Sequence, residues 1–182
     1  MSLFKMGHPI RIALLLFAGL AISACGFHLR ENVKLPVGMQ RVHLSVSGGG
    51  DLQRKLTRAL VASGIEVEDN KGTGIAELSV PTASFSTDSL SQGGYVQITE
   101  YAVRYHVQFF VNDANGRALV PAQRIDMQRE YSYDNTNASG NAAQVKELQK
   151  SLNDDMVQAI LFRLQAAGQH APAAPATAAS SR

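Results

Sequence analysis

The chain has a single cysteine, Cys25, in 182 residues, and its thiol is the most distinctive reactive group in the sequence. A thiolate can attack an electrophile, bind a metal or form a disulfide, but one cysteine cannot form a disulfide within its own chain. The preceding residues indicate its use. Lys5 and Arg11 lie before or at the start of an apolar stretch, residues 12–22, which is too short to span a membrane and is typical of a secretory signal.

The order Ile22-Ser23-Ala24-Cys25 is that of a bacterial lipobox. In such a motif the thiol is alkylated by diacylglycerol, the chain is cut before the cysteine, and the new amine is acylated. Two or three acyl chains, at about 0.8 kcal/mol per buried methylene, form a stable membrane anchor. We therefore expect Cys25 to carry N-palmitoyl and S-diacylglycerol groups; the alternative is an ordinary signal peptide that leaves a free cysteine.

Other residues that could do chemistry lack the partners that catalysis or metal binding requires. His28, His43 and His106 are not accompanied by ligands at metal-site spacing, and no Gly-x-Ser-x-Gly elbow frames a nucleophile. Asp154 and Asp155 are adjacent, so on a helix their side chains point about 100° apart. The sequence predicts no catalytic residues, no metal and no cofactor, and hence a protein that is not an enzyme.

The charge of the mature chain argues against a nucleic-acid partner. Removal of residues 1–24 takes away Lys5 and Arg11, so 17 basic residues become 15, against 15 acidic ones. A nucleic-acid binder would show a basic excess. A local basic patch, Arg54, Lys55 and Arg58, could meet a phosphorylated lipid, although the solvated side of an amphipathic helix is the favoured interpretation.

The elements expected around these residues are a strand over 41–47, a helix over 51–64, a short extended piece over 65–69, an uneven strand over 75–85, a long hairpin over 101–133 and a helix over 144–164. Asp51 is expected to cap the first helix, and Gly64 to end it. Pro81 indicates an edge position or a bulge. Asn115-Gly116 favours a type I′ turn in the hairpin. These elements predict an α+β fold, with two helices packed on one face of a four-stranded, largely antiparallel mixed sheet.

The strongest pattern is the alternation that begins at Tyr101. Apolar side chains occupy one face of this strand, at Tyr101, Val103, Tyr105, Val107, Phe109 and Val111. Arg104 and His106 lie on the opposite, polar face, where they could contact a ligand or a protein. An ordinary solvent-exposed sheet face is the alternative.

Composition divides the chain into four parts. We expect a lipoprotein signal peptide over residues 1–24, a lipidated extended leader over 25–40, a folded domain over 41–167 and a tail over 168–182. The tail consists mainly of alanine, proline and serine, which bury too little surface to fold.

Three stretches carry a resemblance to a known family. Residues 25–30 read Cys-Gly-Phe-His-Leu-Arg, the hairpin ends Tyr-Ser-Tyr-Asp-Asn at 131–135, and an amphipathic helix covers 144–164. This layout resembles the LPS-assembly lipoprotein LptE family of the Gram-negative outer membrane. Why the start requires Phe27, His28 and Arg30 does not follow from the residues themselves.

The resemblance implies a domain that plugs the lumen of the barrel protein LptD in a 1:1 complex. There it would assist barrel assembly and lipopolysaccharide insertion into the outer leaflet, on a lipid anchor facing the periplasm. Family members are thought to contact lipopolysaccharide through basic residues, but the corresponding stretches here, 89–94 and 138–142, contain no lysine or arginine. Arg104, His106, Lys146, Arg54 and Arg58 are the remaining candidates for lipopolysaccharide or barrel contact.

Two alternatives belong to other functional classes. A lipid-carrying envelope lipoprotein without a barrel partner would need an apolar groove, whereas the apolar sheet face is expected to be covered by the helices. An anchored envelope hydrolase would need a nucleophile in a catalytic context, which the sequence does not show.

Overall fold

The computed structural model describes residues 35–48, 50–90, 100–133 and 136–169. Its elements, in chain order, are β1 (Arg41–Val46), α2 (Gly50–Ala62), β2 (Glu66–Glu68), β3 (Ala76–Ser89), β4 (Glu100–Asn112), β5 (Ala118–Ser132) and α3 (Ala138–Gln169). The predicted signal peptide, Cys25 and the leader up to residue 34 lie outside the described residues, as does the tail from residue 170.

The strands form one mixed sheet in the order β2-β1-β3-β4-β5, with β1 parallel to both of its neighbours and β3, β4 and β5 antiparallel. The expected count of four strands is therefore wrong, because β2 adds a fifth. This strand lies within the expected short extended piece over 65–69, but its three residues are too few for an alternating pattern to predict that it pairs into the sheet. It pairs with β1 through the register Arg41↔Glu66, and the Glu66 amide donates to the Gln40 carbonyl at 2.9 Å.

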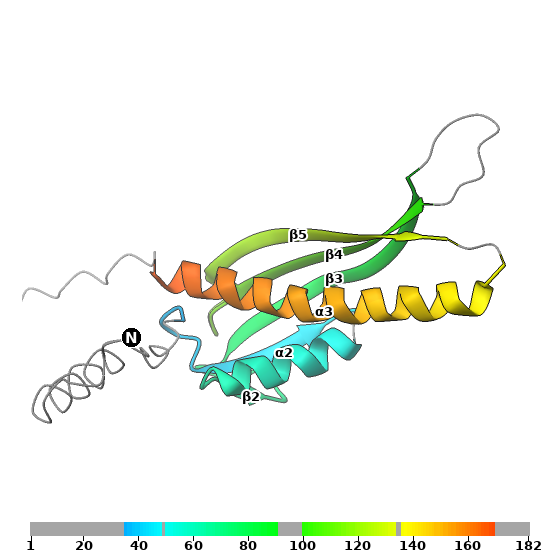
Figure 1. Cartoon of the computed structure of the whole chain (residues 1–182). Helices are drawn as coiled ribbons and strands as arrows, with labels where there is room; N and C mark the ends of the chain where they lie inside the picture. Colours follow the sequence, from blue (N-terminus) through cyan, green and yellow to red (C-terminus); the bar gives the residue numbers. More distant parts are fainter. Residues whose placement is uncertain (1–34, 49, 91–99, 134–135, 170–182) are drawn as a thin grey trace, which may run out of the picture. The chain divides into compact units, whose positions relative to one another are not determined.

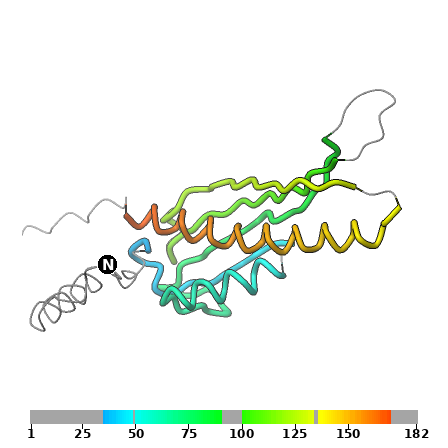
Figure 2. Tube along the Cα trace, in the orientation of Figure 1, coloured from blue at the N-terminus to red at the C-terminus, as the bar shows by residue number. Residues whose placement is uncertain are grey.

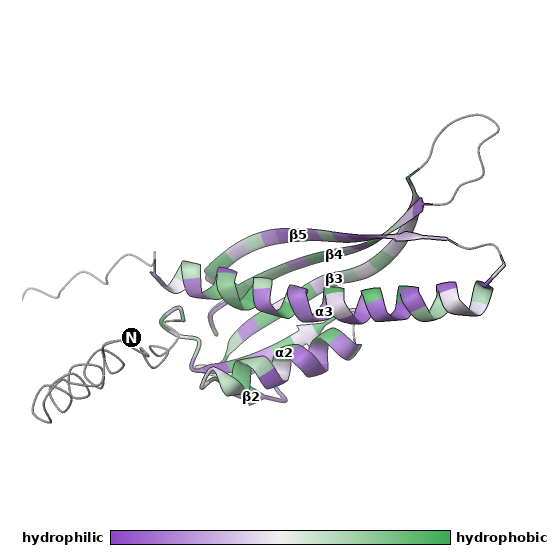
Figure 3. Cartoon of the chain, in the orientation of Figure 1, coloured by the Kyte–Doolittle hydropathy of each residue, from purple (hydrophilic) through white to green (hydrophobic). Residues whose placement is uncertain are grey.

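Both helices lie on one face of the sheet, as expected (Figure 1). Their apolar side chains pack against those of the strands in one core. In Figure 3 hydrophobic segments, coloured green, occur on both the helices and the strands. Fully buried large side chains at the centre of this core include Tyr105, Phe109, Leu56, Met156 and Ile160. The opposite face of the sheet is left without a covering layer among the described elements.

Helix α2 buries Leu52, Leu56 and Leu60, which recur every four residues and so share one side. It ends as predicted, because Gly64 adopts φ +85° and the Ile65 amide donates to the Leu60 carbonyl at 3.1 Å. Asp51 is not the residue before the helix but lies in its first turn.

Helix α3 is longer than the expected 144–164. The Asn137 side-chain oxygen accepts from the Gly140 amide at 3.0 Å, so Asn137 caps the helix and lets it begin at Ala138. The helix continues to Gln169, which places the first two residues of the predicted tail inside it. At 1.5 Å per residue its 32 residues measure about 48 Å.

Strand β3 contains the bulge that Pro81 suggested, since its register with β4 shifts between Ser79 and Thr82. The turn between β4 and β5 differs from the expected type I′. Gly116 has φ +81°, but Asn115 does not have a positive φ, and the Gly116 amide donates to the Asp113 carbonyl at 3.0 Å. This is a type I turn followed by a left-handed glycine, the usual three-residue hairpin loop.

The three antiparallel strands extend well past their neighbours. β1 pairs only with residues 76–80 of β3, whereas β3 and β4 remain paired as far as Ser89 and Tyr101 (Figure 2). α3 runs along this extended part, while α2 covers the part next to β1 (Figure 1).

Candidate interaction surface

The face of the sheet opposite the helices is a polar surface built by β3, β4 and β5. Arg104 and His106 lie on it, as the alternation of β4 predicts, and the strand register places polar residues of β3 and β5 beside them. We call this surface the polar face and define it by Ser84, Ser86, Asp88, Arg104, His106, Gln108, Arg124, Asp126 and Gln128.

The charges of the polar face are paired, both across strands and within β5. Nε of Arg104 lies 3.2 Å from Oδ2 of Asp88. Asp126 accepts from two side chains, with Nδ1 of His106 at 2.6 Å and Nε of Arg124 at 2.8 Å. The Arg124 guanidinium, and after it the His106 ring, hold the pKa of the Asp126 carboxyl below its usual 3.8.

These groups form a hydrogen-bonding surface. The Arg104 and Asp126 side chains keep about half of their surface exposed, at 53% and 57%, so they can still bond to a partner. Within residues 35–48, 50–90, 100–133 and 136–169, no three His, Cys, Asp or Glu side chains are grouped as a metal site would require. No helix in the described residues is long and apolar enough to cross a membrane.

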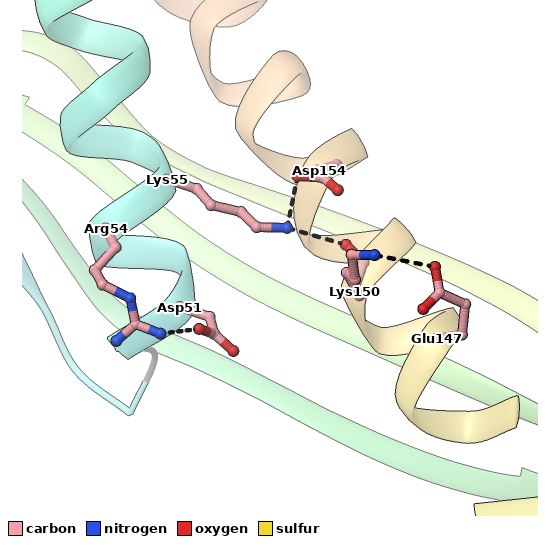
Figure 4. Close-up of polar contacts among 6 residues, drawn as sticks. All are labelled: Asp51, Arg54, Lys55, Glu147, Lys150 and Asp154. Carbon is pink, nitrogen blue, oxygen red and sulfur yellow. Dashed lines mark hydrogen bonds and ion pairs between the residues drawn. The ribbon is translucent and has the colours of Figure 1, made fainter. Parts of the chain in front are cut away.

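The basic residues of α2 lie on the helix layer, and two of the three form ion pairs (Figure 4). Arg54 pairs with Asp51 one turn earlier. Nζ of Lys55 lies 2.6 Å from Oδ1 of Asp154 and 3.3 Å from the Lys150 carbonyl, so it joins α2 to α3. These contacts support the interpretation of the patch as the outer side of an amphipathic helix.

Arg58 and Lys146 are exposed, and no ion pair joins either of them to another described residue. The structure thus separates the candidate site residues. Arg104 and His106 lie together on the polar face, whereas Arg54, Arg58 and Lys146 lie on the two helices. Cys25 lies outside the described residues.

Sequence reasoning missed the acidic half of the polar face, Asp88 and Asp126, together with Arg124. Asp126 could not be found by aligning the two halves of the hairpin about residues 113–116, because the register of β4 with β5 shifts twice between Phe109 and Asn112. Asp88 could not be placed either, because its register depends on the bulge in β3.

A cleft of about 430 Å³ at the hairpin-turn end of the sheet was also not expected. Its lining includes His43, Glu77 and Asp113. Lys71 pairs with Glu77 at 2.7 Å and is the main cause that lowers the pKa of this carboxyl. Two backbone amides and Arg117 likewise lower the pKa of Asp113. The charges of the cleft are therefore satisfied within the domain.

Fold and surface together define an α+β domain with one helix layer and one exposed, charge-paired sheet face. The model of the LptE family, described as lipopolysaccharide-assembly, matches residues 39–164, and the chain belongs to this family. A curated relative, the LPS-assembly lipoprotein LptE of Yersinia enterocolitica, is 25% identical over 166 residues, which cover 87% of this chain and 77% of the relative.

Solved structures share the fold. A lipoprotein B from Nitrosomonas europaea has a TM-score of 0.67 and 24% identity, covering 80% of this chain and 94% of its own. The rare lipoprotein B of Shewanella oneidensis has a TM-score of 0.60 and 22% identity, covering 69% of this chain and 94% of its own. A minor lipoprotein from Acinetobacter baumannii has a TM-score of 0.59 and 23% identity, covering 70% of this chain and 92% of its own.

Proposed function

We propose that this chain is an outer-membrane lipoprotein, anchored through a lipidated Cys25, whose domain plugs the LptD barrel in a 1:1 complex. In this position it assists barrel assembly and the insertion of lipopolysaccharide into the outer leaflet. Residues 1–24 are the signal peptide, residues 25–40 are the leader, and residues from 41 to the end of α3 are the plug.

The observation that carries the proposal is the polar face. A sheet with one covered and one uncovered face, rich in paired charges, suits a polar environment with hydrogen-bonding partners, and the lumen of an outer-membrane barrel is polar. In the Asp88–Arg104 pair and the pairs of Asp126, the carboxylate and arginine side chains remain about half exposed or more, so they can also bond to a partner. Membership of the lipopolysaccharide-assembly family supports the same partner.

A pulldown in mild detergent through the C-terminal tail tests the partnership. We expect one large barrel protein, LptD, in equal amounts with the lipoprotein. A second test adds bulk to the polar face with Gln108→Trp, since Gln108 is exposed on β4, the strand between β3 and β5. This variant should reduce the recovered barrel at least tenfold while its circular dichroism melt stays near that of the wild type.

Gln158→Trp is the matched control, because Gln158 is also exposed but lies on α3, in the helix layer. It should leave the recovered barrel unchanged. If Gln108→Trp binds the barrel as well as the control does, the polar face is not the contact. If the wild type brings down no barrel, the plug function is wrong.

Direct contact with lipopolysaccharide is a finer proposal. Arg54, Arg104 and His106 already have acidic partners in the domain, whereas Arg58 and Lys146 are exposed and form no ion pair with another described residue. We therefore place any phosphate contact at Arg58 and Lys146. Arg58→Gln with Lys146→Gln should weaken lipopolysaccharide binding, and Lys150→Gln, which removes a charge already paired with Glu147, is the control.

The lipid-carrier alternative requires an apolar cavity for acyl chains. A cleft of the described domain at the hairpin end is lined by His43, Lys71 and Glu77, and another between α2 and α3 has the charged Lys55, Arg58 and Asp154 around the apolar Ala59 and Val157. Acyl lipid that co-purifies with the domain in the absence of a barrel would favour this alternative.

A further inference from the structure

The sheet has three stretches of free edge within the described residues, and they differ in how well they are protected. β2 forms one outer edge, β5 forms the other, and the part of β3 beyond the end of β1 forms the third. An unpaired edge presents backbone N–H and C=O groups to any other extended chain, so folded proteins usually block it with charge, proline, short length or a covering group.

Two of the edges are blocked in these ways. β2 has only three residues, and two of them are glutamates. β5 contains Pro121 and several charged residues, and Nη1 of Arg163 on α3 donates to the Arg124 carbonyl at 3.2 Å. Both edges therefore resist the addition of another strand.

The third edge is the least protected of the three. β1 pairs with β3 only as far as Val80, and no described strand pairs with that side of β3 from Ser84 to Ser89. The residues 84–87 read Ser-Phe-Ser-Thr, without charge or proline. Asp88 is the one charged residue among residues 84–89, and it pairs with Arg104 on the polar face.

The register identifies the backbone groups that this edge presents. The Leu90 amide donates to the Glu100 carbonyl at 3.0 Å, which makes this pair a hydrogen-bonded one. Hydrogen-bonded and non-bonded pairs alternate along antiparallel strands. Even-numbered residues from Thr82 to Leu90 therefore bond to β4, and the N–H and C=O groups of Phe85, Thr87 and Ser89 point away from it.

Two contacts agree with this assignment. A Cβ on Gly48, which follows β1, would lie 3.3 Å from the Ala83 carbonyl oxygen, so this odd-numbered carbonyl faces the β1 side. On β5 the same alternation directs the Arg124 carbonyl outward, where Arg163 binds it. Three outward residues, spaced about 6.8 Å apart, thus remain available on β3.

We propose that this edge of β3, from Phe85 to Ser89, accepts an extended segment of the partner barrel protein as an added strand. The inference rests on the proposed plug function. Alternating backbone donors and acceptors at strand spacing are matched by another extended backbone. The edge is continuous with the polar face, because Ser84, Ser86 and Asp88 of the same strand belong to that face, so a partner that covers the face also reaches the edge.

The chemistry of the added segment follows from the two sides of β3. On the helix side it would lie beside Phe85, which is half-buried and stacks on Tyr105 with ring centroids 3.9 Å apart, so apolar side chains fit there. On the other side it would lie beside Ser84 and Ser86, which suit polar side chains. The strands of a closed barrel already bond to one another, so the segment comes from a loop or another non-barrel part of the partner.

Hydrogen–deuterium exchange resolved to single amides tests the proposal on the full lipoprotein, alone and in the purified barrel complex. In the free protein the Ser84 and Ser86 amides should be protected by β4, and those of Phe85 and Thr87 should exchange at least tenfold faster. In the complex the Phe85 and Thr87 amides should slow at least tenfold, while Ser84 and Ser86 change little.

Substitution at Thr87 gives a second readout. Thr87→Pro removes an outward N–H without removing a bond to β4, and proline is tolerated at such edge positions. We expect at least fivefold less barrel in the pulldown than with Thr87→Ala, which keeps the N–H. If circular dichroism shows that Thr87→Pro does not fold, Thr87→Lys, which adds a charge to the edge, takes its place.

The outcomes separate the inference from the proposed function. A 1:1 complex in which the Phe85 and Thr87 amides stay fast overturns the added strand and leaves the plug function standing. Protection already present in a dimer of the free protein would identify a second copy as the occupant and also overturn it. If no barrel co-purifies, the plug function is wrong and the inference falls with it.

Discussion

Replacement of Lys55 and Asp154 tests whether the basic stretch of α2 is part of the scaffold or free to bind a ligand. Nζ of Lys55 lies 2.6 Å from Oδ1 of Asp154 (Figure 4), and the Lys55 side chain is only 20% exposed, against 60% for Asp154. Exposed ion pairs contribute about 0.2–1 kcal/mol to stability. Because the lysine is largely shielded from water, we expect a coupling free energy near the upper end, about 1 kcal/mol.

A double-mutant cycle with Lys55→Met, Asp154→Asn and the double variant measures this coupling by urea unfolding. Lys55→Met should cost more than Asp154→Asn, because Lys55 also donates to the Lys150 carbonyl at 3.3 Å. In about 1 M salt, where the Debye length falls to about 3 Å, the coupling should decrease.

The Arg54–Asp51 pair is the control for this cycle. It lies within one helix, both side chains are about two-thirds exposed or more, and it joins no two elements. Its coupling should be about 0.3 kcal/mol or less. A Lys55–Asp154 coupling no larger than this control would refute the reasoning. Lys55 would then contribute little to the packing of α2 on α3 and would be available to an anionic ligand.

Three further predictions concern the core and the polar face. Met156→Ala, at a fully buried position of α3, should lower the free energy of unfolding by about 2–5 kcal/mol in urea. The pKa of Asp126 lies below 3.8, so the stability it contributes is present above pH 3.8 and is lost as the pH falls through the lower folded value. Arg124→Gln should raise this pKa toward 3.8 in an NMR titration. Asn153→Leu should raise the free energy of unfolding by about 1 kcal/mol, since Oδ1 of Asn153 is buried without a hydrogen-bond partner in the described residues; a lower thermal midpoint would contradict this.

The parts of the fold that the sequence predicted are those with a long periodic signal. The alternation from Tyr101 to Val111 placed Arg104 and His106 on the polar face, because side chains of a strand point to opposite faces in turn. Gly64 correctly marked the end of α2, since its left-handed conformation favours glycine. Such signals depend only on neighbouring residues.

The parts that were missed depend on contacts between distant residues. β2 is held by its pairing with β1 rather than by its own three residues. The hairpin turn at Asn115 is a three-residue loop instead of the expected type I′ turn. The Asp113 carboxylate stabilises this loop by accepting hydrogen bonds from the Asn115 and Arg117 amides. Helix α3 begins before Gln144 because Asn137 caps it, although the first turns bury little apolar surface.

The bulge at Pro81 explains both the uneven pattern of β3 and the make-up of the polar face. Before the bulge, Leu78 and Val80 point into the core; after it, the alternation has shifted by one residue, and Phe85 turns inward to stack on Tyr105. Without this shift Phe85 would join the polar side of the sheet, and Asp88 would turn away from Arg104. One extra residue thus sets the charge pairing of this face and the side chains that flank the free edge of β3.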